Sequence, residues 1–116
     1  MNYERQKRLV ERLLDRTQAG ELSWQEGVRP DTFQVSFPNN SVQVIPIDNG
    51  KLNEFQIAII DHFGRVVDNV TNAQLDRFTP HPSGPWSSVM KELYVAARRS
   101  AFNADAAIDN ILVEIE

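Results

Sequence analysis

Two histidines are the residues with which metal or acid–base chemistry would start in this sequence. His62 follows Asp61 in the segment DHFG, and His81 lies in the proline-rich segment TPHPSGPW, residues 79–86. Two imidazoles and a carboxylate can bind zinc if the two segments meet in space. The histidine spacing matches no local metal motif, since HxH, HxxxH and HExxH are all missing from the sequence. We therefore expect both histidines to be solvated and predict no metal site.

Serines and paired carboxylates are the other candidates for catalysis. Ser83 and Ser87 lie close to His81 in sequence, but the sequence has no G-x-S-x-G nucleophile elbow. Asp105 and Asp109 lie one helical turn apart, and an acid–base pair needs unlike environments to separate its two pKa values. The five glycines are scattered and form no phosphate-binding loop. We predict that the chain is not an enzyme and uses no cofactor.

Two arginines and one aromatic residue are better suited to binding than to catalysis. Arg98 and Arg99 are neighbours on a predicted helix, where successive side chains point about 100° apart. One can bridge to the acidic C-terminal segment, or the pair can bind a partner's carboxylate or phosphate. Phe63 lies beside His62 at a predicted hairpin tip, where it either folds onto the core or anchors a partner. The candidate partner-binding residues are Arg98, Arg99, Phe63 and His62.

Composition excludes several classes of function. The 116 residues include no cysteine, which excludes disulfides, thiol nucleophiles and Cys-ligated metals. The net charge of −4, without a dense basic stripe, argues against nucleic-acid binding. Residues 1–19 carry five basic side chains and residues 103–116 carry four acidic ones and no base, which predicts that a basic first helix lies near an acidic last helix. Since no apolar run suits a signal peptide or a membrane span, we expect a cytoplasmic protein that binds no membrane.

Hydropathy patterns place these residues on elements of a single domain, residues 1–116. A narrow apolar stripe predicts an N-terminal helix that ends at Gly20, and Thr71 with Gln74 predicts a capping box that starts a short helix. Residues alternate at 32–37 and 54–61, whereas the phase of 41–47 is unclear. With 65–70, these four short strands joined by turns predict an antiparallel meander. Asn39–Asn40 is expected to turn the first hairpin with positive φ angles. Pro46 predicts an edge or a bulge in the second strand.

The C-terminal third is predicted to be helical. The segment 79–86 is interpreted as a connector, with Pro85 at the first helical position and Ser83 or Gly84 as its cap. Asn103 predicts a break before a last helix whose apolar face holds Ala107, Ile108, Ile111, Leu112 and Ile115. One bent helix over 86–115 is the alternative. The predicted fold is therefore α+β, a four-stranded antiparallel meander sheet with an N-terminal helix and two C-terminal helices packed on one face.

Three stretches of the chain carry a resemblance. They are LLDRTQAGELSW at 13–24, TFQVSF with SVQVIPI at 32–47, and LYVAARRSAFNADAAIDNIL at 93–112. Together they resemble small stand-alone bacterial α+β proteins of unknown function. The resemblance implies a bacterial or phage origin and supports the α+β fold, and it implies no activity and no catalytic residues.

Three classes of function remain. The leading hypothesis is a non-enzymatic accessory module that binds and regulates another protein, as an immunity protein, an antitoxin-like inhibitor or a chaperone does. A small-molecule-binding domain or unconventional enzyme with a pocket between sheet and helices is the first alternative. A structural subunit of a larger bacterial or phage assembly, with a homo-oligomer left open, is the second.

Overall fold

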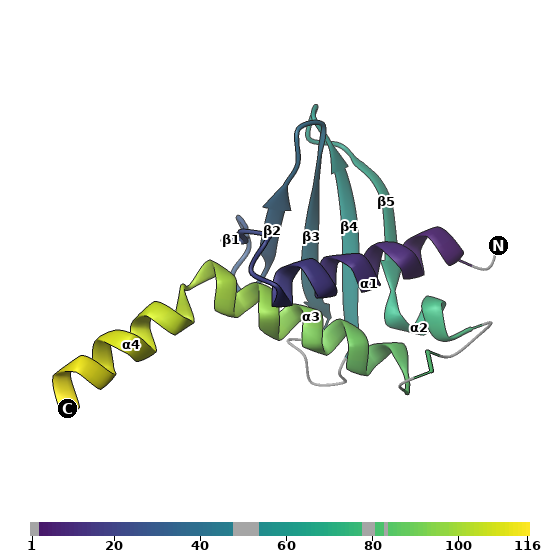
Figure 1. The fold of residues 1–116 in the computed structure, drawn as a ribbon. Coiled ribbons are helices and arrows are strands. Elements are labelled where there is room, and N and C mark those ends of the chain that lie inside the picture. Colours follow the sequence, from purple (N-terminus) through teal and green to yellow (C-terminus); the bar gives the residue numbers. More distant parts are fainter. Residues whose placement is uncertain (1–2, 48–53, 78–80, 83) are drawn as a thin grey trace.

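The computed structural model describes residues 3–47, 54–77, 81–82 and 84–116 of the chain. It confirms an α+β fold with an antiparallel sheet and helices at both ends (Figure 1). The helices among the described residues are α1 (Glu4–Gln18), α2 (Asn72–Asp76), α3 (Trp86–Ala101) and α4 (Ala104–Ile115). The strands are β1 (Gln25–Glu26), β2 (Phe33–Ser36), β3 (Asn40–Ile47), β4 (Glu54–Asp61) and β5 (Val66–Thr71).

The sheet has one strand more than the sequence predicts. Its order is β1-β2-β3-β4-β5 and every neighbouring pair is antiparallel, so the predicted meander is present but begins earlier. The prediction of four strands was wrong because β1 is two residues long, too short for an alternating pattern to mark it. It pairs Gln25 with Gln34 and Glu26 with Phe33.

The register gives the sheet one apolar face and one face of mixed character, where polar side chains stand beside Ile45, Ile60 and the buried Ala58. Phe33, Val44, Ile57 and Val70 stand opposite one another across four strands, and all are at most 2 % exposed. The adjacent row, on the other face, holds Gln34, Gln43, Ala58 and Asn69, where the Gln43 amide donates to Gln34 at 2.9 Å. Since side chains alternate along a strand, this register places the apolar row toward the helices.

Helices α1 and α3 cross the apolar face side by side (Figure 1). Spacing of three and four residues puts Val10, Leu13 and Leu14 on the buried side of α1. The same spacing buries five residues of α3, which are Trp86, Val89, Met90, Leu93 and Ala97. All of these belong to the same core cluster as the apolar row of the sheet.

Pro46 and the first hairpin depart from expectation. β3 lies inside the sheet rather than at its edge, and Pro46 pairs with Phe55 of β4. On the other side of β3, the pairing with β2 ends at Phe33 and Val44. Pro46 lies beyond that last pair, so its missing N–H costs the β2–β3 ladder no hydrogen bond. The turn between β2 and β3 is closed by the Phe37 N–H donating to the Asn40 carbonyl at 2.7 Å. The predicted positive φ angles at Asn39 and Asn40 were wrong.

The connection between β5 and α3 contains the predicted capping box. The Thr71 hydroxyl accepts from the Gln74 N–H, and the Gln74 side chain accepts from the Thr71 N–H. α3 begins at Trp86, one residue later than predicted, with Pro85 as its N-cap. The Trp86 N–H is satisfied by the Asp76 carboxylate at 2.9 Å, a partner ten residues away that no local cap pattern indicates. The proposed cap Ser83 lies outside the described residues, as do 78–80 of the connector.

The prediction that both C-terminal helices pack on the sheet was wrong for α4. The break at Asn103 is confirmed, so 86–115 is two helices rather than one. Asn103 has φ 53° and ψ 51°, a left-handed conformation that asparagine tolerates better than most residues. This turn carries α4 past the end of α3 and away from the sheet (Figure 1).

A buried amide that joins β4 to α2 gives a stability prediction. Asn72 is 7 % exposed, and its Oδ1 accepts the Phe55 N–H at 2.8 Å. Replacing Asn72 by Ala leaves that N–H buried without a partner, so the free energy of unfolding should fall by about 1–3 kcal/mol. Urea denaturation measures the change. Asn69→Ala, at an exposed position of β5, is the matched control and should change it by less than about 0.5 kcal/mol; equal losses in both variants would contradict this role for Asn72.

Candidate functional site

α4 is an amphipathic helix that the described part of the chain leaves uncovered. None of its twelve residues, all of which the structure describes, is buried. Spacing of three and four residues gathers four of its five larger apolar side chains on one side, and they are 42–74 % exposed: Ile108, Ile111, Leu112 and Ile115. The fifth, Val113, is 79 % exposed on the other side of the helix. Around this apolar stripe stand carboxylates without any basic residue: Asp105, Asp109, Glu114 and Glu116.

Such exposure is unusual for a helix of this length. Most helical stability in proteins comes from packing of an apolar face, and an isolated helix of about 12 residues is marginal in water. A contiguous exposed apolar patch of this kind marks an interaction site in a well-folded protein. The apolar stripe of α4 is therefore the first candidate binding surface.

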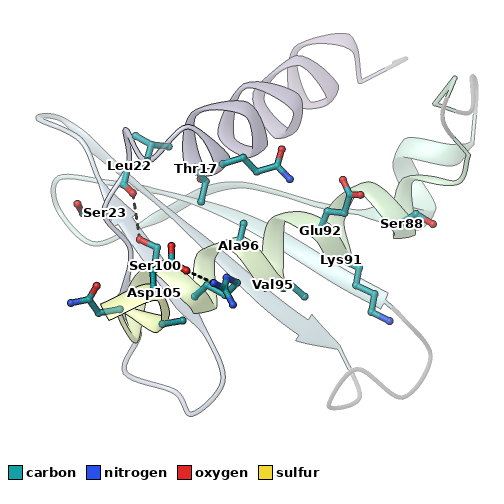
Figure 2. Close-up of a pocket in the computed structure, with 15 residues that line it drawn as sticks. Thr17, Leu22, Ser23, Ser88, Lys91, Glu92, Val95, Ala96, Ser100 and Asp105 are labelled. Carbon is teal, nitrogen blue, oxygen red and sulfur yellow. Dashed lines mark hydrogen bonds and ion pairs between the residues drawn. The ribbon is translucent and has the colours of Figure 1, made fainter. Parts of the chain in front are cut away.

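A groove lies beside the root of α4 (Figure 2). It has a volume of about 840 Å³. Its walls are the end of α1, the connection from α1 to β1, the outer side of α3 and the first turn of α4. The lining includes Thr17, Leu22, Ser88, Lys91, Glu92, Val95, Ala96, Arg99, Ser100 and Asp105. Segments about 70 residues apart in sequence thus form one surface.

One wall of the groove is fixed by hydrogen bonds between distant segments. The Ser100 hydroxyl accepts the Trp24 N–H at 3.0 Å and donates to the Leu22 carbonyl at 3.4 Å. The Trp24 indole N–H donates to the Thr17 hydroxyl at 2.9 Å, which donates in turn to the Leu13 carbonyl. Trp24 is 3 % exposed, so the connection from α1 to β1 is pinned against α3 by a buried aromatic side chain.

The two candidate arginines are held differently at the junction of α3 and α4. Arg99 forms an ion pair with Asp105 in the first turn of α4. The Arg98 guanidinium lies 5.3 Å from the centre of the Phe102 ring. Only Arg99 therefore reaches the acidic helix. Since α4 leaves from the C-terminal end of α3, the predicted neighbourhood of the basic first helix and the acidic last helix is wrong for most of α4 (Figure 1).

The tip between β4 and β5 is a second exposed surface. Phe63 is 70 % exposed, so it does not fold onto the core. Its ring lies 4.0 Å from the His62 ring and 5.1 Å from the Arg65 guanidinium, measured between centres. Asp61 organises the turn by accepting the N–H groups of Phe63 and Arg65, both at 3.0 Å, and the Arg65 Nε–H at 2.9 Å.

These hydrogen bonds stabilise the charged form of Asp61. The pKa of its carboxyl is lowered, first by the backbone N–H of Arg65 and also by the Arg65 side chain. Burial of Asp61 opposes the shift but does not outweigh it. The tip is therefore a hydrogen-bonded turn on which Phe63 and His62 are exposed.

The two histidines do not come together. His62 lies at the tip between β4 and β5, whereas His81 lies near the start of α3, at the opposite end of the sheet (Figure 1). His81 Nε2 is 3.4 Å from Glu11 Oε1 of α1, and its ring stacks edge-on against Trp86 at 4.9 Å. Within the described residues, no three His, Asp or Glu side chains gather as metal ligands would.

Comparison of the chain with protein-family models, with characterised proteins and with solved structures gives no match. The resemblance to small bacterial proteins of unknown function therefore stays a prediction. Among the helices of the described residues, none is long and apolar enough to cross a membrane.

The groove was not predicted from the sequence. Ser88, Lys91, Glu92, Val95 and Arg99 repeat at spacings of three and four, which marks the side of α3 opposite its buried stripe. That periodicity indicates an outer face, but only the structure brings α1 and the root of α4 alongside it. The apolar stripe of α4 was found in the sequence and assigned to the core, since a pattern identifies an apolar face without naming what covers it.

The turn at Asp61 predicts a specific dependence of stability on pH. Because the folded-state pKa is lowered, the stabilisation by Asp61 is present above the unfolded-state pKa of about 3.9 and is lost as pH falls through the folded-state value. Asp61→Asn should therefore lower the melting temperature at pH 7, and the gap to the wild-type protein should close toward pH 2–3. Thermal melts across this range measure it, with Asp15→Asn on α1 as the control for a lost charge. A gap that is constant with pH would contradict the role of the charged form.

Proposed function

We propose that this chain is a protein-binding module that engages its partner through α4. The observation that carries the proposal is the uncovered apolar stripe on a twelve-residue helix that projects from the body of the protein. An amphipathic helix of this kind binds by laying residues at spacings of three, four and seven into an apolar groove. Ile108, Ile111, Leu112 and Ile115 have that spacing.

The charges of α4 favour a protein over a lipid surface or a nucleic acid as the partner. Helices that lie on membranes are typically rich in Lys and Arg on their polar face, whereas α4 has neither. The three carboxylates of α4, with Glu116 directly after it, would also repel a phosphate backbone. The matching surface is a groove in a protein, with apolar side chains in its middle and basic side chains in its walls.

Within this class we propose an accessory or regulatory role. The absence of cysteine and of recognisable catalytic motifs in the sequence supports binding rather than chemistry. A rigid body with one projecting helix suits a protein that acts by occupying a surface of its target. The acidic character of α4 would also steer it toward a basic partner and speed their encounter at low salt.

The apolar stripe gives a direct test by substitution. Ile111 lies in the middle of the stripe and is 55 % exposed, so Ile111→Lys should leave the fold intact. Burial of one Ile side chain is worth about 1.5–3 kcal/mol. Recovery of a stoichiometric companion in tagged co-purification from the native host should therefore fall about tenfold or more.

Val113→Lys is the matched control for this experiment. Val113 lies on the opposite side of α4 and is 79 % exposed, so the same new charge there should leave the companion bound. Equal recovery with both variants, or equal loss with both, would contradict binding through the stripe. Circular dichroism of the two purified variants checks that each is folded.

A further inference from the structure

The chain carries a groove that matches its own α4 in length. The groove follows α3 from Ser88 to Ser100, and twelve helical steps of 1.5 Å give about 18 Å. α4 has twelve residues and is also about 18 Å long. The lining of the groove continues onto Ala104 and Asp105, so α4 starts at one end of the groove (Figure 2). From there α4 runs away from the sheet and from α3 (Figure 1).

This arrangement suits an exchange of helices between two copies. In a twofold dimer, each surface contacts its counterpart reciprocally. A twofold axis near Asn103 would send the α4 of each copy back along the groove of the other, antiparallel to α3. Both apolar stripes would then be covered at the same time, and no second kind of surface is needed.

The side chains in the middle of the groove suit a helix that enters antiparallel to α3. The middle of an incoming α4, at Ile111 and Leu112, would lie over Val95 and Ala96, and Val95 is 47 % exposed. The acidic end of that helix, at Glu114 and Glu116, would lie near both Lys91 and Glu92 at the start of α3. Lys91 attracts this end and Glu92 repels it, so the match rests on the apolar middle of the groove rather than on charge.

At the other end of the groove, Arg99 already contacts a carboxylate of α4 in the single chain. It pairs with Asp105 of its own copy, and both are largely exposed, with side chains 50 % and 88 % accessible. In the antiparallel arrangement the first turns of the two α4 helices meet near the axis. Each Arg99 would then lie within a cluster of carboxylates from both copies.

From the length, the apolar middle and the position of the groove, we infer that the partner of α4 is a second copy of this chain, whose α4 occupies the groove between α1, α3 and the root of α4. This inference rests on the proposed function, because it names the partner of the same helix. It makes the functional form a reciprocal dimer, in which each copy provides one helix and one groove.

The oligomeric state of the purified full-length chain tests the inference. Sedimentation equilibrium should give a concentration-dependent monomer–dimer equilibrium for the wild-type protein. Lys91→Glu places an acid opposite Glu114 and Glu116 and should weaken the dimer about tenfold or more. Arg77→Glu, the same charge change at an exposed position at the end of α2, should not weaken it.

A charge exchange makes the test specific for the groove. Glu114→Lys with Glu116→Lys should weaken the dimer, and adding Lys91→Glu to these two changes should restore it. Restoration supports α4 in the groove, because only residues that face each other compensate in this way. The inference would be overturned if Lys91→Glu left the dimer affinity unchanged. It would also be overturned if the triple variant dimerised no more tightly than Lys91→Glu alone or than Glu114→Lys with Glu116→Lys.

The outcome separates this inference from the proposed function. A chain that sediments as a monomer at all concentrations, yet loses a different companion in Ile111→Lys, would overturn self-pairing and leave α4 as the binding helix. A dimer that Ile111→Lys leaves intact would overturn the inference, because α4 would then play no part in it. A monomer whose companion is also indifferent to Ile111→Lys would overturn both.

Discussion

The left-handed backbone of Asn103 is the constraint on which the functional surface depends. With helical angles there, α4 would continue α3 as one helix; with φ 53° it leaves in a new direction. The ladder of α3 ends with the Phe102 N–H on the Arg98 carbonyl, and α4 starts with the Ala107 N–H on the Asn103 carbonyl. Phe102 and Asn103 therefore end α3 and set the direction of α4. In that direction the sheet does not cover the apolar stripe of α4.

The core of the protein explains why α4 can point away from the sheet. Phe33, Val44, Ile57 and Val70 cross the sheet as one buried row, and α1 and α3 cover that row without help from α4. Trp24, bonded to Thr17 and to Ser100, fixes the connection from α1 against α3. A core that is complete without its last helix leaves that helix available for binding, and the same contacts shape the groove beside it.

Periodicity was sufficient for most elements and insufficient for the site. The stripe of α1, the alternation at the start of β2 and β4 and the capping box at Thr71 and Gln74 are local patterns, and each is present in the structure. β1 was missed because two residues carry no period, and the role of Asp76 in starting α3 was missed because its partner is ten residues away. The apolar stripe of α4 was identified correctly, but its assignment to the core was wrong, since the direction of α4 depends on the left-handed backbone angles of Asn103. The groove joins residues 17–23 to 88–105, a contact between distant segments that no local pattern contains.

Amide hydrogen exchange of α4, residues 104–115, at increasing protein concentration is the most direct test of an uncovered helix that a second chain covers. The account predicts almost no protection of these amides in dilute protein, because a short exposed helix opens readily, while α3 stays protected by the core. Protection of α4 should then rise with concentration as the helix is covered. Strong protection of α4 at every dilution would contradict the account, because it would mean that a single chain covers its own last helix.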